Sequence, residues 1–158
     1  MVREGFESSI QQLKQEVEKM FDGVLELVEE SVESLVNKDV VLARKVIAKD
    51  DIIDEYMYDI EEKTIELIAL QQPMAKELRI IFSISKIITD LERVGDFCVN
   101  IFKETIKIGD EEHIKPLVDI PKMKTIIIEM IKSTKESFTD EDSHLAYRVG
   151  KEDELVDN

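Results

Sequence analysis

The chain has 158 residues, enough for one domain or two small helical bundles with a real core. It carries 21 basic and 36 acidic residues, and the net charge of −15 opposes nucleic acid or anionic lipid as a direct partner and favours cations or basic protein surfaces. With five glycines, three prolines and no tryptophan, it lacks the turn chemistry of a β-sandwich or barrel, so the composition favours helices.

The compartment is inferred from the cysteine and from the apolar runs. Cys98 is the only cysteine, which excludes an internal disulfide and a cysteine-based zinc site. The N-terminal residues show no apolar stretch of the roughly 7–15 residues that a signal peptide needs. No later run approaches the roughly 18 residues that span a bilayer, so we expect a cytoplasmic protein.

Two long amphipathic helices are predicted first. Apolar residues recur three or four positions apart from Phe6 to Val36, which predicts one helix over this segment. Asp39 is placed to cap a second helix that runs from Val40 to about Leu70. The apolar stripe expected on this second helix comprises Leu42, Val46, Ile53, Tyr56, Ile60, Ile65 and Ile68.

A third helix follows a turn at Gln71–Gln72. Pro73 is expected in its first turn, since proline lacks an N–H and disfavours helical geometry at the preceding residue. The helix should continue to about Ile108, where Gly109 ends it. Its expected apolar stripe comprises Leu78, Ile81, Ile84, Ile88, Leu91, Phe97 and Ile101. Three helices of about 30 residues with short connections predict an all-α, antiparallel three-helix bundle.

The rest of the chain repeats the beginning. A shift of 103 residues places Met20–Asp54 on Met123–Asp157 without a gap, with ten identical positions among 35. The sequence therefore predicts three parts. They are a complete three-helix repeat in residues 1–110, a linker at 111–121, and the first two helices of a truncated second repeat at 122–158. Two helices alone would expose apolar surface and favour a homo-oligomer.

Acidic pairs spaced i, i+4 are the candidate functional residues, because this spacing puts both carboxylates on one helical face. The pairs are Asp50 and Asp54, Glu92 and Asp96, and Asp153 and Asp157. Acidic pairs are usually solvated, but aspartate is a poor helix former and the first pair recurs in the repeat. Counted from a turn near Gln72, Asp54 and Glu92 lie 18 and 20 residues away, so the first two pairs are expected at nearly the same height.

Carboxylates gathered at one level predict a metal site, since they repel each other strongly unless a cation neutralises them. With oxygen ligands only, a hard ion such as Fe³⁺, Mn²⁺, Mg²⁺ or Ca²⁺ is favoured over zinc or copper. Neither His113 nor His144 belongs to a Glu-x-x-His motif of the di-iron type, and no obvious nucleophile is present, so we expect no enzyme. A carboxylate–metal hydrolase or oxidase is the enzymatic alternative.

Basic residues offer one further candidate site. Lys76, Arg79 and Lys86 follow Pro73 and could bind an anion near the turn. Scattered cations more often balance a solvated helix face, and the sequence favours that interpretation here.

The stretch from Leu67 to Ile101 resembles the PhoU family, through its QQP turn, its ELR segment and its DLERVGD core. The resemblance extends backward through DDIIDEYMYDIEE and forward into the second repeat, so it covers nearly the whole chain. It implies a fold of two three-helix repeats whose E/D-x-x-x-D motifs hold metal clusters, with iron as the first choice. The three acidic pairs fill three of the four expected motifs, and the fourth would lie on the missing helix.

The resemblance also implies a function. PhoU-like proteins act as negative regulators of phosphate uptake, as adaptors between the ATPase subunit of a phosphate ABC transporter and a sensor histidine kinase. Such a protein is cytoplasmic and meets the inner membrane only through its partners. Two alternatives stay open: an accessory domain of another phosphate carrier, and a purely structural helical bundle that oligomerises.

Overall fold

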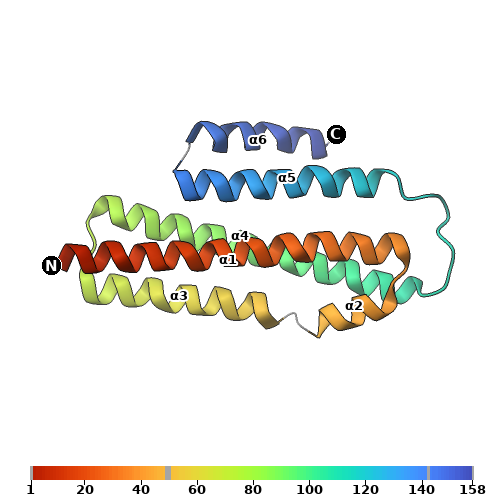
Figure 1. The fold of residues 1–158 in the computed structure, drawn as a ribbon, viewed down its shortest axis with the longest axis horizontal. Helices are drawn as coiled ribbons and strands as arrows, with labels where there is room; N and C mark the ends of the chain where they lie inside the picture. The colour runs from red at the N-terminus through yellow and green to blue at the C-terminus, as the bar shows by residue number, and fades with distance from the viewer. Residues whose placement is uncertain (1, 49–50, 142, 158) are drawn as a thin grey trace.

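The computed structural model describes residues 2–48, 51–141 and 143–157, and every regular element in these ranges is a helix. The helices are α1 (Val2–Asn37), α2 (Val40–Ile47), α3 (Asp51–Gln71), α4 (Ala75–Ile108), α5 (Asp119–Asp140) and α6 (Ser143–Asp157). Helices α1, α2–α3 and α4 form one bundle in which each successive segment runs antiparallel to the one before (Figure 1). Helices α5 and α6 form a hairpin beside α1, on the far side from α3. This confirms the predicted all-α bundle, and the division into three parts stays a prediction.

The predicted cap of the second helix is confirmed. The N–H of Leu42 donates a hydrogen bond to Oδ1 of Asp39 at 2.9 Å, and the N–H of Ala43 donates to the carbonyl of Asp39 at 3.0 Å. Lys38 turns the chain with a φ of 52°. The corresponding cap expected at Asp142 lies outside the described residues.

The single helix predicted from Val40 to Leu70 is wrong, because the structure ends α2 at Ile47 and begins α3 at Asp51. Local chemistry explains the interruption. Arg44 and Lys45 lie in the last turn of α2, where positive charge interacts favourably with the helix dipole. The aspartates that follow favour a helix start, which places Asp54 in the first turn of α3.

The α3–α4 turn differs from the prediction by two residues. Gln72 has a φ of 43°, and α4 begins at Ala75, so Pro73 precedes the helix and does not lie in its first turn. The N–H of Met74 donates to Oε2 of Glu77 at 2.6 Å, which fixes Met74 as the capping residue. The predicted end at Ile108 is confirmed, since Gly109 closes the helix with a φ of 52°.

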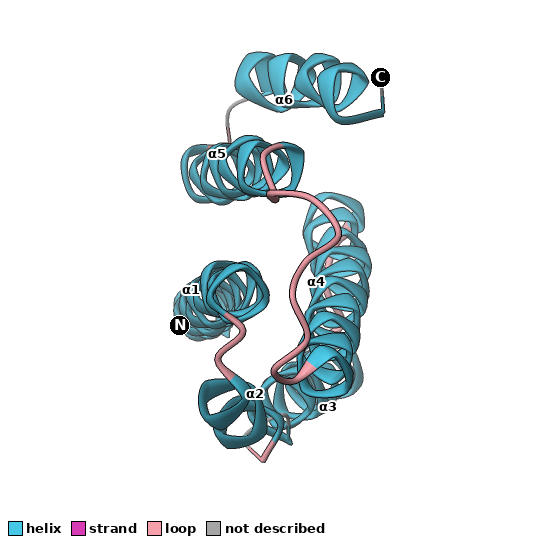
Figure 2. Cartoon of the chain, turned by 90° about the vertical axis from the view of Figure 1, so that its right-hand side faces the viewer, coloured by secondary structure: helices cyan, strands magenta, loops and turns pink. Residues whose placement is uncertain are grey.

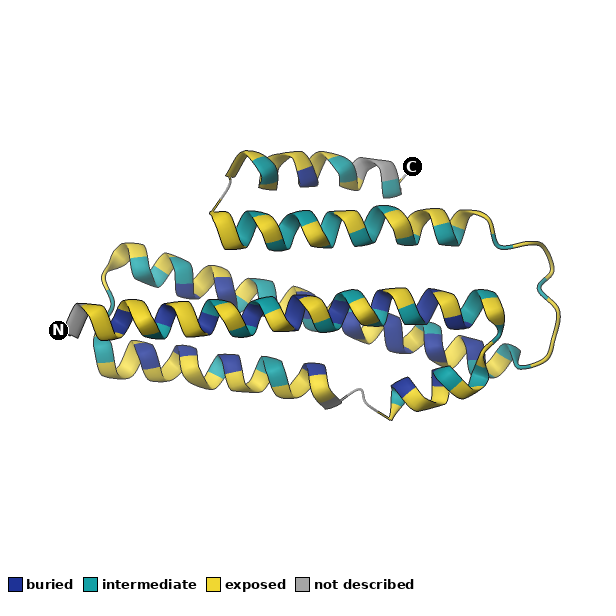
Figure 3. Ribbon diagram, viewed as in Figure 1, coloured by how far each residue is buried: buried dark blue, intermediate teal, exposed yellow. Residues whose placement is uncertain are grey.

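The hydrophobic core lies between α1, α3 and α4 (Figure 3). Phe21, Ile60, Ile84 and Phe102 are among its fully buried side chains. Most predicted stripe residues are buried or half-buried. The prediction is wrong for Ile65, Ile68 and Phe97, which are 66%, 39% and 62% exposed. Thr64, Leu67, Cys98 and Phe102 occupy the buried positions instead.

Helix α5 packs on the side of α1 that faces away from α3, and α6 packs on α5 (Figure 2). No residue of α5 is fully buried, although Phe138 lies with its ring 6.2 Å from that of Phe21. Ion pairs line this contact, joining Lys14 to Glu141 at 2.9 Å, Asp22 to Lys135 at 2.8 Å and Glu29 to Lys124 at 2.6 Å. No described helix is both long and apolar enough to cross a membrane.

Candidate metal centre

Three predicted carboxylates meet where α3 begins beside the middle of α4. Asp54 comes from the first turn of α3, and Glu92 and Asp96 lie one turn apart on α4. One oxygen from each of the three carboxylates lies within 4.8 Å of the other two. The hairpin therefore brings residues 38 and 42 positions apart in the sequence to the same height, as counting from the turn predicts.

The side chain before Asp54 packs beside two glycines, and at one of them, Gly23, a Cβ would be too close. Ile53, the residue before Asp54, is buried, and a Cβ built at Gly95 would lie 3.5 Å from its Cγ2 atom. A Cβ at Gly23 of α1 would lie only 2.9 Å from its Cδ1 atom. The Ile53 side chain thus packs between α1 and α4, next to two glycines. This packing orients the first turn of α3 so that Asp54 faces α4.

The oxygen positions suit a hard cation. Such ions bind carboxylate oxygens at about 2.0–2.6 Å, so two ligands of one ion lie at most about 4–5 Å apart. The three oxygens lie within 4.8 Å of one another, which falls inside the upper part of this range. Asp54 and Asp96 are exposed and Glu92 is half-buried, which leaves the site open to water as further ligands.

The surroundings add acidic and phenolic oxygens. Asp54 lines an open hollow of about 520 Å³ together with Glu55, Tyr58 and Asp59. The pKa of Tyr58 is raised, first by its hydrogen bond to Glu62 and then by the charge of that carboxylate. Tyr58 therefore stays a neutral phenol at neutral pH, and the charged oxygens of this face are carboxylates.

The remaining predicted ligands are not brought to this cluster. Asp50 lies outside the described residues. Asp153 and Asp157 are exposed on α6, and no third carboxylate, histidine or cysteine joins them within the part of the chain that the structure describes. Asp153 lines an apolar groove of about 600 Å³ between α1, α4, α5 and α6.

Sequence reasoning missed Gly23, although one signal was available. Glycine in a helix interior costs about 1 kcal/mol relative to alanine, so its presence at the centre of a 36-residue helix indicates a packing reason. Gly95 inside the ERVGD segment lies against the Ile53 side chain, but a Cβ there would make only an ordinary van der Waals contact with it.

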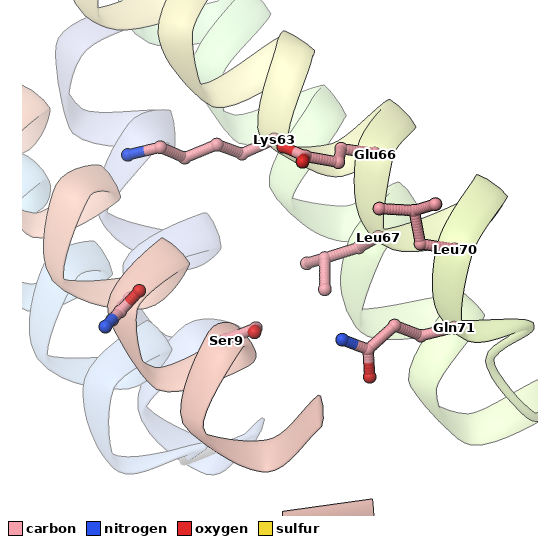
Figure 4. A pocket seen from close by; sticks show the side chains of 7 residues that line it. Ser9, Lys63, Glu66, Leu67, Leu70 and Gln71 are labelled. Carbon is pink, nitrogen blue, oxygen red and sulfur yellow. The ribbon is translucent and has the colours of Figure 1, made fainter. Parts of the chain in front are cut away.

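A second hollow, of about 220 Å³, lies between the start of α1 and the end of α3 (Figure 4). It is lined by Ser9, Gln12, Lys63, Glu66, Leu67, Leu70 and Gln71. Its amide oxygen on Gln71 is buried without a hydrogen-bond partner among the described residues. Gln71 lies 17 residues beyond Asp54, roughly 25 Å along α3, so this hollow is separate from the carboxylates.

Comparison with known proteins identifies relatives over most of the chain. A family model described as the PhoU domain matches residues 17–105. The phosphate-specific transport system accessory protein PhoU homolog of Aquifex aeolicus is 40% identical, over 94% of this chain and 67% of that protein. The PhoU homolog of Clostridium acetobutylicum is 38% identical, over 100% of this chain and 73% of that protein.

Solved structures agree with the sequence matches. The crystal structure of PhoU from Pseudomonas aeruginosa superimposes with a TM-score of 0.91 at 29% identity, over 96% of this chain and 73% of that chain. The phosphate transport system regulatory protein PhoU from Streptococcus pneumoniae gives a TM-score of 0.89 at 26% identity, over 96% and 72%. The chain thus spans between two thirds and three quarters of the proteins that it resembles.

Proposed function

The chain belongs to the PhoU family, and we propose that it is a metal-binding negative regulator of phosphate uptake and phosphate-starvation signalling. The observation that carries the metal part of this proposal is the cluster of Asp54, Glu92 and Asp96, whose oxygens lie within 4.8 Å of one another. Relatives named as accessory proteins of phosphate-specific transport support the role in phosphate uptake.

The bound ion would act as a clamp between two helices. Asp54 would hold it from α3, and Glu92 and Asp96 from α4, with Asp50 as a further candidate ligand. A hard cation supplies positive charge that offsets the repulsion of three carboxylates, so binding favours the close packing of α3 on α4. Iron is the first choice, with manganese, magnesium and calcium as alternatives. Asp153 and Asp157 are proposed as the start of a second site.

The proposed partners are proteins. They are the ATPase subunit of the phosphate ABC transporter and a sensor histidine kinase, which the chain would link without catalysing a reaction. The net charge of −15 suits docking on basic protein surfaces. A cytoplasmic location, with membrane association only through the transporter, and a homo-oligomeric state belong to the same proposal.

Metal content tests the site directly. Wild-type protein purified without chelators is compared by elemental mass spectrometry with the variant Asp54→Asn/Glu92→Gln/Asp96→Asn. A matched control changes three exposed acids elsewhere, Asp110→Asn, Glu112→Gln and Asp140→Asn, and so removes the same charge.

Bound iron or manganese in the wild type and the control, lost in the folded triple variant, supports the clamp. Equal metal in all three proteins, or none in any, overturns it. Circular dichroism confirms that each protein is folded. Binding of the purified transporter ATPase, measured with and without metal, then tests the adaptor role separately.

A further inference from the structure

Three cationic side chains from two helices line a hollow of about 340 Å³ at the end of the molecule where α4 begins and α5 ends. They are Lys14 of α1 and Lys76 and Arg79 of α4. The rest of the lining comprises Ile80, Ser83, Ser137, Phe138 and Glu141. We propose that this basic hollow binds a small tetrahedral oxyanion, and the choice of inorganic phosphate as that ligand rests on the proposed role in phosphate uptake.

The lining of the basic hollow differs in charge from the chain as a whole. The chain as a whole has a net charge of −15, yet among the described residues the lining of this hollow gathers three cations and one carboxylate, that of Glu141. The described lining of the hollow is therefore positively charged on a protein whose total charge is negative. This local charge favours the approach of an anion.

Lys14 and Glu141 show that the positive charges converge. The Lys14 side chain is only 14% exposed, and its Nζ donates to Oε1 of Glu141 at 2.9 Å. The pKa of Glu141 is lowered, first by this hydrogen bond and the charge of Lys14, and further by the charge of Lys76, while burial opposes the shift. The Glu141 carboxylate thus already occupies the position that an anion would take.

Lys76 and Arg79 form no ion pair among the described residues. They lie three residues apart in the first two turns of α4, and among the described residues neither has a carboxylate within 4.0 Å. Arginine presents a planar fork of N–H donors that matches two oxygens of a phosphate. The helix terminus itself is not the site, since Glu77 already accepts from the N–H of Met74.

The remaining walls suit a compact oxyanion. Ile80 and Phe138 form an apolar side of the hollow. Ser83 and Ser137 contribute hydroxyl groups, and that of Ser83 donates to the carbonyl of Arg79 at 2.8 Å. The sequence suggested Lys76, Arg79 and Lys86 as one group. In the structure the third cation of the lining is Lys14, which precedes Lys76 by 62 residues, and not Lys86.

The basic hollow is separate from the carboxylate cluster. Arg79 lies 13 residues before Glu92, which is roughly 20 Å along α4. Phosphate binding can therefore be measured on protein stripped of metal, where a bound ion cannot capture the phosphate. Phosphate binding to the basic hollow is consequently independent of metal binding to the carboxylate cluster.

The test is a titration of the chelator-treated full chain with inorganic phosphate at constant ionic strength. NMR chemical shifts are recorded at each phosphate concentration. Sulfate and chloride are titrated in parallel. We expect saturable shifts for residues of the basic hollow with a dissociation constant of about 1 mM. The double variant Lys76→Gln/Arg79→Gln should weaken binding at least about tenfold, because it removes two charge-assisted contacts.

Two further variants sharpen the result. Lys86→Gln/Lys103→Gln removes two exposed charges from the same helix and should leave binding unchanged. Glu141→Gln removes the competing carboxylate and should strengthen binding several-fold. The proposal is overturned by unsaturable shifts in the wild type, by equal weakening in the Lys86/Lys103 control, or by saturation with sulfate and not with phosphate.

Discussion

A Cβ atom at position 23 would lie 2.9 Å from Cδ1 of Ile53, closer than real Cβ atoms come to a neighbouring carbon. Ile53 immediately precedes Asp54, the ligand candidate that α3 contributes to the carboxylate cluster. The terminal methyl of Ile53 therefore occupies the space that a side chain at position 23 of α1 would need. This contact lies at the first turn of α3, the turn that carries Asp54.

Gly23→Ala should not stabilise the protein, although alanine is the better helix former. The gain of about 1 kcal/mol in helix propensity is offset by displacement of the buried Ile53 side chain. Gly5→Ala in the same helix meets nothing within 4 Å and should raise the free energy of unfolding by about 0.5 kcal/mol. Urea denaturation compares the two, and an equal gain for both variants would show that the Gly23 contact is not tight.

The effect of Asp96→Asn on the stability of the protein should change sign when a metal ion binds. In metal-free protein it removes one of three neighbouring carboxylates, so stability rises by a few tenths of a kcal/mol at low salt. This gain should shrink in 0.5 M NaCl because salt screens exposed charges. With a saturating hard cation, the same variant loses a ligand and becomes less stable than wild type. Thermal unfolding with and without chelator measures both effects, and Asp110→Asn, outside the helices, serves as the control.

Phe102 and Phe97 form a matched pair on α4, fully buried and 62% exposed respectively. Phe102→Ala should lower the free energy of unfolding by about 3–5 kcal/mol, because it leaves a cavity in the core. Phe97→Ala should cost less than about 1 kcal/mol. Urea denaturation decides between this assignment and the apolar stripe expected from sequence, which would make Phe97 the costlier position.

Cys98 should make stability depend on pH in the alkaline range. Burial raises the pKa of its thiol from 9.0 to about 11, against a smaller lowering effect of Ser31. The folded state therefore holds the proton more tightly. Its contribution is complete below pH 9 and is lost as the pH rises toward 11, with roughly 2–3 kcal/mol at stake.

The difference in urea midpoint between wild type and Cys98→Ala, followed from pH 8 to 10.5, isolates this contribution from other titrating groups. The stability advantage of the wild type should decrease over this range. Modification of Cys98 by a thiol reagent at pH 8, at the same rate in folded and urea-unfolded protein, would show that the thiol is neither buried nor shifted.

Local rules predicted most of the fold from sequence. The cap at Asp39 and the end at Gly109 follow from side-chain hydrogen bonding and from glycine's freedom at positive φ. The interruption after Ile47 was missed because the apolar spacing continues across it. Phe97 was wrongly predicted to be buried because it is large and apolar. The buried stripe of α4 comprises Leu91, Gly95, Cys98, Phe102 and Thr105, and three of these residues are small or polar and therefore give a weak apolar signal.

The candidate site was predictable only in part. Counting residues from the turn placed Asp54 level with Glu92, since an antiparallel hairpin fixes height along its axis. The rotation of each helix about its axis depends on packing, so the seat of Ile53 against Gly23 required the folded structure. Lys14 likewise joins the basic hollow only because α5 docks on α1, a contact between segments more than 100 residues apart.

The backbone of α5 approaches those of α1 and α6 alone, among the described helices. The arm formed by α5 and α6 is therefore attached along a single line, with no fully buried residue in α5. We expect such an arm to open as its own cooperative unit, with amide hydrogens that exchange before those of the first bundle. Three ion pairs follow the line of attachment beside apolar contacts of Ile127, Ile131 and Phe138, so added salt should make that exchange faster.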